Sequence, residues 1–325
     1  MRGTISDTSG TADRPWATAG REPFTHPALF YRGEREYLAG TVPFVTGALA
    51  GGEPVAVAVP PHNLELLRGA LGGAATDVVM LDMTEAGRNP GHIIPGVLRA
   101  FADRHPGRRV RIIGEPIWAG RSAHEYPACA QHEALINHAF AGRPVTILCP
   151  YDVGTLRPKV LTDALRTHPL VVDAHGQRAS DRYAPDDVVA DYNRPLPPLA
   201  GATAVTVDLA GLSALRHTAI GLAAGAGLGA ERVQDVALAL TELAGNSLEH
   251  GGGAAEVLMG TDGAHLVCQV RDSGQLADPL AGCRPAAPGQ IRGRGLLLVH
   301  HVADLVRTHT GPAGTCVEAR FLLGR

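Results

Sequence analysis

The stretch Glu242-Leu-Ala-Gly-Asn246-Ser-Leu-Glu-His250-Gly251, read with two short motifs that follow it, indicates how the last third of this chain folds. The two motifs are Asp272-Ser-Gly274, at the end of an apolar run, and Gly293-Arg294-Gly295-Leu296, at the start of another. Their order is a carboxylate and an amide on a helix, then Asp-x-Gly after a strand, then Gly-x-Gly before a helix. This arrangement predicts a site for magnesium, adenine and a triphosphate that needs no P-loop.

Glu242 and Asn246 are four residues apart, so they share one face of a helix predicted over 231–250. The side-chain oxygen of Asn246 is a neutral ligand suited to Mg²⁺, which otherwise keeps waters and phosphate oxygens. Glu242, one turn earlier, could accept a proton from a hydroxyl group approaching the γ-phosphate. Taken alone, this helix could equally be a surface helix with ordinary polar residues.

Asp272 and Gly274 follow a strand-like run. A buried carboxylate at Asp272 could accept a hydrogen bond from the exocyclic amine of adenine, and Gly274 would let the backbone approach the base. A plain turn at the end of a strand explains the same residues, because Asp-Ser-Gly is a common turn sequence.

Gly293-Arg294-Gly295-Leu296 could present backbone amides to phosphate at the start of a helix. Thr315, near the last strand, could add a hydroxyl group to the phosphates, although a hairpin end explains it as well. Residues 275–292 contain proline and glycine with little pattern, and they suit a lid over the nucleotide.

In combination, the three motifs resemble the GHKL ATPase superfamily over residues 203–325. Residues 212–251 resemble its branch of anti-sigma-factor serine/threonine kinases, in which Glu precedes Asn by four residues and His-Gly closes the helix. This resemblance implies ATP and Mg²⁺ as cofactors, an anti-sigma-factor antagonist as substrate, a sigma factor as partner, and a common tendency to dimerise. It would make Glu242 the base, Asn246 the Mg²⁺ ligand, Asp272 the adenine reader, and Gly274, Gly293 and Gly295 the nucleotide loops.

Two departures from that family keep other functions open. Gln275 stands where a second glycine often follows, and Lys159 is the only lysine in the chain, so Arg292 or Arg294 would have to neutralise the γ-phosphate. A non-catalytic ATP-binding module is therefore the main alternative. A sensor histidine kinase is the third, although the segment before residue 204 is too short and proline-rich for the helical hairpin that such kinases need.

The first half of the chain alternates strand-like and helix-like segments. Strands are expected at 55–59, 78–81, 110–113, 145–148 and 170–172, with helices at 63–71, 92–104, 123–141 and 156–166. Such alternation predicts a mainly parallel sheet with helices on both faces. The layout is RecA-like, but Pro60-Pro61-His62-Asn63 stands where a P-loop needs glycine and lysine.

The same region resembles the MEDS sensory domain in four motifs: His26-Pro-Ala-Leu-Phe-Tyr31, Gly114-Glu115-Pro-Ile-Trp118, His132-Glu133-Ala-Leu-Ile-Asn137 and Cys149-Pro150-Tyr151-Asp152. This resemblance covers residues 24–172 and implies a signal input whose ligand it does not identify.

A metal site is a competing interpretation of this region. Cys129 and His132 have ligand spacing on a predicted helix, and His26, Glu115, His124 or Cys149 could complete the set. The simpler interpretation is that Cys129 is a small core residue, since the chain has 15 histidines and such coincidences are common.

A chain of 325 residues favours two domains. We expect a disordered tail at 1–22, a sensory domain at 23–176, a polar, proline-rich linker at 177–203 and an ATP-binding α/β sandwich at 204–325. In the last part, strands are expected at 204–208, 257–259, 264–271 and 316–322, and helices at 213–224, 231–250 and 296–306.

Composition narrows the functional classes further. A formal net charge of −3 gives no general attraction to nucleic acid or anionic membrane. No apolar run reaches the roughly 20 residues that a membrane span needs, and residues 1–22 lack the apolar core of a signal peptide. The five cysteines form no Cys-x-x-Cys pair and are typical of a reducing compartment. These features predict a cytoplasmic protein.

Overall fold

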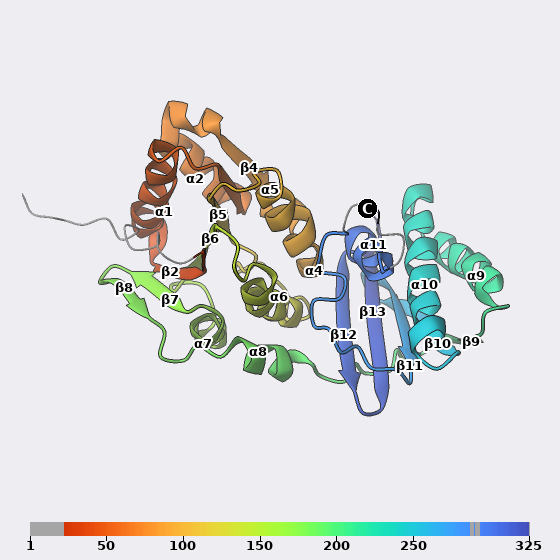
Figure 1. Ribbon diagram of the computed structural model, residues 1–325. Helices are drawn as coiled ribbons and strands as arrows, with labels where there is room; N and C mark the ends of the chain where they lie inside the picture. The colour runs from red at the N-terminus through yellow and green to blue at the C-terminus, as the bar shows by residue number, and fades with distance from the viewer. Residues whose placement is uncertain (1–22, 287–288, 290–292, 325) are drawn as a thin grey trace, which may run out of the picture.

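The computed structural model describes residues 23–286, 289 and 293–324, and these residues fold around two separate β-sheets (Figure 1). The N-terminal sheet has eight strands and the C-terminal sheet has five. Helices cover both sheets, which confirms the predicted α/β class. The expected tail at 1–22 lies outside the described residues. No described helix is long and apolar enough to cross a membrane.

The N-terminal sheet is parallel except at its last strand. Its strands are β1 (Phe24–Thr25), β2 (Pro27–Tyr31), β3 (Val55–Val59), β4 (Val78–Asp82), β5 (Val110–Gly114), β6 (Val145–Asp152), β7 (Leu170–Asp173) and β8 (Gly176–Ala179). The order is β4-β3-β5-β6-β2-β7-β8, and β1 also pairs with β6. Only β8 is antiparallel, against β7. The sequence therefore predicted the parallel sheet correctly but missed β1, the internal strand β2 and the antiparallel edge strand β8.

Helices pack on both faces of this sheet. They are α1 (Gly33–Ala50), α2 (Pro61–Leu71), η1 (Gly72–Asp77), α3 (Met83–Ala86), α4 (Pro90–His92), η2 (Ile93–Arg99), α5 (Ala100–Ala102), α6 (Tyr126–Ala139), α7 (Pro158–Thr167) and α8 (Pro185–Tyr192). Val57 of β3 packs with the apolar cluster of α1 and α2, whereas its neighbour Ala58 packs with that of η2, α6 and α8. Successive strand residues point to opposite faces, so both faces of the sheet are core.

The structure corrects one prediction about this half. The single helix expected over 92–104 is a π-helical turn, η2, between short α-helical pieces. Pro95 lies inside it, and proline lacks the N–H group that an α-helix would need there. Pro60 alone separates β3 from α2, so no glycine loop follows this strand.

The segment 177–203, expected as a linker, is partly folded. It contains most of β8 and all of α8, which packs against α6 and α7. Val188 and Tyr192 of α8 are buried, and the Tyr192 hydroxyl group donates to Asp163. Beyond α8, the carbonyl group of Pro197 accepts a hydrogen bond from Gln269 of the second sheet. Tertiary contacts thus anchor a segment whose composition alone resembles a flexible linker.

The C-terminal sheet is antiparallel throughout, in the order β12-β13-β11-β10-β9. Its strands are β9 (Thr203–Val207), β10 (Ala255–Asp262), β11 (His265–Asp272), β12 (Leu305–Gly311) and β13 (Gly314–Leu322), with helices α9 (Leu212–Gly225), α10 (Ala230–His250) and α11 (Gly295–Val302). Helix α10 contacts β10, β11 and β13 through a buried apolar face. The helix expected over 296–306 ends at Val302, and the sequence reasoning missed strand β12.

Candidate functional site

Helix α10 carries the first part of the candidate site. Ala, Leu and Val residues supply its buried face, including Val236, Leu240 and Leu243. This packing turns Glu242 and Asn246 toward the start of α11, where both are half-buried. An ideal Cβ atom on Gly295 would lie 2.6 Å from Glu242 Oε2 and 3.2 Å from Asn246 Nδ2. Glycine at this position therefore lets α11 begin directly against the two polar side chains.

The carboxylate of Asp272 is held in place at the end of β11. Its Oδ2 accepts a hydrogen bond from the Ser247 hydroxyl group at 2.6 Å, and its Oδ1 accepts one from the Gly274 amide at 2.8 Å. Two glycines pack tightly around it: an ideal Cβ on Gly251 would lie 2.4 Å from Asp272 Cγ, and one on Gly314 would lie 1.9 Å from the Asp272 carbonyl oxygen. The carboxylate keeps further lone pairs that could accept from a ligand.

Thr315 lies opposite Asp272 in the pairing of β11 with β13. Its hydroxyl group donates to the carbonyl oxygen of Gly274 at 2.8 Å and lies 3.0 Å from the Thr310 hydroxyl group. Thr310 in turn accepts a hydrogen bond from the Leu276 amide at 2.9 Å. These hydrogen bonds tie residues 274–276 to β12 and β13, so Thr315 holds the loop after Asp272. The Thr315 hydroxyl proton is donated to the Gly274 carbonyl group.

These residues meet around one cavity of about 580 Å³. The sequence-predicted residues that line it are Asn246, Asp272, Gly274, Gly293, Gly295, Leu296 and Thr315. Glu242 lies beside it, against Gly295. Arg294 is exposed and is not among the lining residues, and Arg292 lies outside the described residues. The cavity falls within the range of about 300–1,000 Å³ that is usual for small-molecule sites.

Among the lining residues that sequence reasoning missed, three could contact a nucleotide through polar groups. Ser247 and His250 follow Asn246 on α10, and Arg284 comes from the segment expected to be a lid. The guanidinium group of Arg284 pairs with Asp278 at 2.5 Å and is about half exposed. Ser247 directly follows Asn246 in the sequence, and this position beside a candidate ligand was the available signal for it. No spacing rule indicated Arg284, because tertiary structure alone brings it to the cavity.

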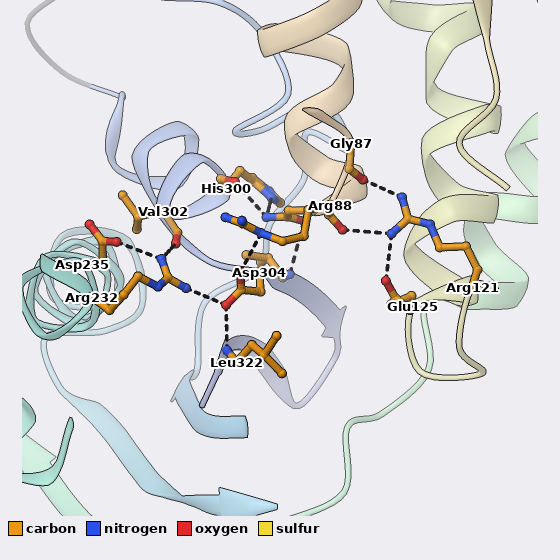
Figure 2. Close-up of polar contacts among 12 residues, drawn as sticks. Gly87, Arg88, Arg121, Glu125, Arg232, Asp235, His300, Val302, Asp304 and Leu322 are labelled. Carbon is orange, nitrogen blue, oxygen red and sulfur yellow. Dashed lines mark hydrogen bonds and ion pairs between the residues drawn. The ribbon is translucent and has the colours of Figure 1, made fainter. Parts of the chain in front are cut away.

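A polar network joins the two halves of the chain (Figure 2). Arg88 pairs with Asp304 at 2.6 Å, and Asp304 also pairs with Arg232 of α10 at 2.5 Å. On the N-terminal side, Arg121 donates to the backbone carbonyl group of Arg88 at 2.9 Å. Asp304 accepts from the Leu322 amide as well. One carboxylate therefore connects the N-terminal domain to α10 and β13.

Helix α11 takes part in both the cavity and this network. It begins at Gly295 in the cavity, and one turn later the carbonyl oxygen of His300 accepts a hydrogen bond from Asn89 at 2.8 Å. An ideal Cβ on Gly91 would lie 2.1 Å from the His300 ring, so the two domains touch closely. Burial, with a smaller contribution from His92, lowers the pKa of His300 to about 4. The ring is therefore neutral at pH 7.

A second cavity, of about 360 Å³, lies between the two domains. Helices α4, α6 and α8 form one side, and the segment 276–283, α11 and β12 form the other. Leu276, Ala281 and Leu296 line both cavities. The wall between the two cavities thus includes the segment that was expected to form the lid.

The proposed pairing of Cys129 with His132 is not what the structure assembles. Both are buried on α6, but neither belongs to the group of metal-type ligands found among the described residues, and His132 lines the cavity between the domains. Glu115 is also separate: Asn63 donates to its carboxylate, and burial raises its pKa to about 8. His26 and Cys149, offered as partners, do lie together in that group.

Comparisons with known families agree with this division of the chain. Residues 25–169 match the MEDS family, the methanogen/methylotroph DcmR sensory domain. Residues 205–321 match the histidine kinase-like ATPase domain. The chain joins a MEDS domain to a histidine kinase-like ATPase domain. The cavity around Asn246 and Asp272 therefore lies in a domain of an ATP-binding family.

Among solved structures, the chain is similar to the RsbU and RsbW domains of a protein from Mycobacterium tuberculosis, at 20% identity and a TM-score of 0.30. That match covers 40% of this chain and 34% of the other, so it spans about a third of that structure's length. No curated protein matched the sequence.

Proposed function

We propose that the ATPase domain is a protein serine/threonine kinase that phosphorylates an anti-sigma-factor antagonist under the control of the MEDS domain. The observation that carries the proposal is the meeting of Glu242, Asn246 and Gly295 at one cavity with the fixed carboxylate of Asp272. The spacing of Glu242, Asn246 and His250-Gly251 supports the anti-sigma kinase type. The protein would work in the cytoplasm, with a sigma factor as its second partner.

The residues present fit a magnesium nucleotide. Asp272 can accept from an amine through a carboxylate that Ser247 and Gly274 already orient. Gly293 and Gly295 bring backbone to the cavity without side chains. Asn246 would hold Mg²⁺ through its side-chain oxygen, and Arg284 is a cation of the lining that could face phosphate.

In the proposed reaction, bound ATP supplies the γ-phosphoryl group and leaves as ADP. Glu242 accepts the proton of the attacking serine or threonine hydroxyl group, whose oxygen forms the new bond to phosphorus. The start of α11 and Arg284 would stabilise negative charge on the phosphoryl oxygens. Since Gly295 lies against Glu242, the proposed base lies directly beside the N-terminus of α11.

The first test is ATP binding by calorimetry, with and without Mg²⁺, on the full chain and on Asn246→Ala. We expect magnesium-dependent binding that the substitution weakens about tenfold or more, because a metal ligand is lost. Gln234→Ala is the matched control, since Gln234 is an exposed amide on the same helix. An absence of ATP binding by the unaltered protein would contradict every ATP-based function proposed here.

The second test is phosphate transfer from labelled ATP to purified anti-sigma-factor antagonists of the same cell. Glu242→Gln should lower the transfer rate by about 10²-fold or more, in the range found for general bases, and leave ATP affinity within about twofold. Transfer that survives this substitution would remove Glu242 as the base.

A non-catalytic ATP-binding module is the second candidate. Arg284 is the one arginine or lysine among the described lining residues, and it is paired with Asp278. In that case ATP would set only the position of the lid and the affinity for a partner. Normal ATP binding with no phosphate transfer to any antagonist would favour it, whereas acid-labile phosphate on the protein itself would favour a histidine kinase.

Control by the MEDS domain would act through α11 and the shared wall of the two cavities. A signal molecule in the cavity between the domains would contact Leu276 and Leu296 directly. Because these residues also line the nucleotide cavity, occupancy of one cavity would bias the shape of the other.

A further inference from the structure

Four buried side chains with metal-binding atoms converge inside the MEDS domain, away from both cavities. They are His26, Glu133, Cys149 and His168, and their ligand atoms all lie within 4.8 Å of one another. Each is at most 1% exposed. His26 precedes β2, Glu133 lies on α6, Cys149 lies on β6, and His168 follows α7. Four segments that are distant in sequence therefore meet at one point in the core.

The hydrogen bonds around the two histidines fix the orientation of their rings. His26 Nδ1 lies 3.2 Å from Asn137 Oδ1, and the Asn137 amide nitrogen donates to the carbonyl group of Thr167 at 2.8 Å. His168 Nδ1 lies 2.9 Å from the carbonyl oxygen of Ala164. His168 Nδ1 also lies 2.9 Å from the Thr167 hydroxyl oxygen, whose own proton is donated to the carbonyl group of Asp163. Each Nδ1 thus faces an oxygen that accepts, so each carries the proton and leaves Nε2 with a lone pair. Metal-binding histidines typically have this arrangement.

Of the groups that face one another, the Cys149 thiol is then the one that carries a proton to donate. Glu133 Oε2 lies 3.3 Å from His26 Nε2 and 3.1 Å from His168 Nε2. Cys149 Sγ lies 3.4 Å from His26 Nε2. Neither oxygen of Glu133 has a hydrogen-bond partner among the described residues, and neither does His168 Nε2. Buried acceptors without a partner are costly, and a cation at their centre would satisfy all of them.

We propose that His26, Glu133, Cys149 and His168 bind one Zn²⁺ ion in tetrahedral geometry. Zinc bonds of about 2.0–2.3 Å place neighbouring ligand atoms roughly 3.3–3.7 Å apart in a tetrahedron. Three of the six separations here are 3.1–3.4 Å, and the other three are at most 4.8 Å. On binding, the Cys149 thiol releases its proton to solvent and becomes a thiolate. The thiolate and the carboxylate balance the two positive charges of the ion, which makes the buried unit neutral.

The proposed ion would fasten α6 to three neighbouring strands. Cys149 lies in β6, His26 precedes β2 and His168 precedes β7, while Glu133 belongs to the helix above them. With all four positions filled by protein, the site is closed and structural in type. It is independent of the proposed kinase activity, because its residues lie in the other domain.

Metal analysis of the purified full chain tests the proposal directly. After exposure to Zn²⁺ and gel filtration, we expect about one zinc ion per chain in the unaltered protein and in Cys129→Ser, which changes a buried cysteine of α6 outside the group. Cys149→Ala and Glu133→Gln should lose at least nine-tenths of the metal. An unaltered protein that takes up no zinc would overturn the proposal, and variants that retain the metal would show that zinc binds elsewhere.

Cobalt substitution identifies the ligands even where a variant folds poorly. Co²⁺ in the unaltered protein should give the strong visible bands of tetrahedral geometry and a thiolate-to-metal charge-transfer band in the near ultraviolet. Asn137→Leu, which removes the partner of His26 Nδ1, should keep both spectra but weaken affinity about 10–100-fold. Weak octahedral spectra without the thiolate band in the unaltered protein would overturn the proposal.

Discussion

At the scale of single residues, the carboxylate of Asp272 is held in a fixed orientation by hydrogen bonds and by closely packed glycines. Two donors hold its carboxylate, and glycines at 251 and 314 allow the chain to close around it. Gly314 also has a φ of +120°, which side-chain-bearing residues rarely adopt. The carboxylate is therefore ordered before a ligand arrives, so a ligand that it recognises would lose little further entropy there.

Replacing Asp272 by Asn tests its role as the adenine reader. The change leaves the side chain's shape intact but turns one acceptor into a donor, so we expect ATP to bind about 10–100-fold more weakly, as for a hydrogen bond to a charged group of about 1.5–3 kcal/mol. Calorimetry with ATP and GTP measures the effect, and the preference for ATP should shrink. Asp208→Asn is the control, because Asp208 also follows a strand and accepts from a glycine amide. Unchanged selectivity would refute the assignment.

At the scale of elements, the contact between α10 and α11 sets the geometry of the cavity where we propose that the phosphates bind. Helix α11 can begin where it does only because Gly295 has no side chain against Glu242 and Asn246. The same helix ends in the network of Asn89 and Asp304. Its eight residues therefore connect the proposed nucleotide cavity with the MEDS domain.

Gly295→Ala tests that contact. The added methyl group would displace Glu242, so we expect phosphate transfer to fall tenfold or more and the free energy of unfolding to fall by about 1–3 kcal/mol, as for other overpacked sites. Gly245→Ala, in the middle of α10, has no atom within 4 Å of the new Cβ and should instead add roughly 0.5–1 kcal/mol. Thermal unfolding and transfer assays compare the two variants. Equal unfolding free energies and transfer rates for the two variants would show that the close approach of Gly295 to Glu242 does not matter for function.

At the scale of the whole molecule, the domains meet through buried neutral histidines as well as ion pairs. Burial lowers the pKa of both His300 and His92 to about 4, with His301 and Arg88 adding to the effect at His92. The unfolded chain takes up protons at its ordinary histidine pKa of about 6.5, whereas the folded protein does not. Stability is therefore fully present above pH 6.5 and falls as the pH drops toward 4.

The pH dependence is checked by denaturant unfolding of the full chain between pH 7 and pH 5. We expect His300→Gln to lose less stability over this range than the unaltered protein, by at most about 2 kcal/mol for one histidine at 1.4 kcal/mol per pKa unit. His217→Gln, an exposed histidine of α9, should show the normal loss. Parallel pH profiles for all three proteins would contradict the burial of a neutral His300.

The sequence was sufficient for the features that depend on local spacing. Glu242 and Asn246 share a helix face because they are four residues apart, and the alternation of apolar runs predicted the parallel sheet. Most errors in the predicted helices and strands came where tertiary contacts outweigh the local preference of the sequence for secondary structure. Residues 185–192 resemble a linker but fold as α8 on α6, and β12 becomes a strand because β13 pairs with it.

Tertiary structure alone placed Arg284 at the cavity, joined Arg88 to Asp304, and brought His26, Glu133, Cys149 and His168 to one point. Motifs had already singled out His26, Glu133 and Cys149, but no linear spacing predicted that they would meet one another and His168. Periodicity reports which residues share a face of one element. The packing of elements against one another decides which faces meet, and side chains become a site only through that packing.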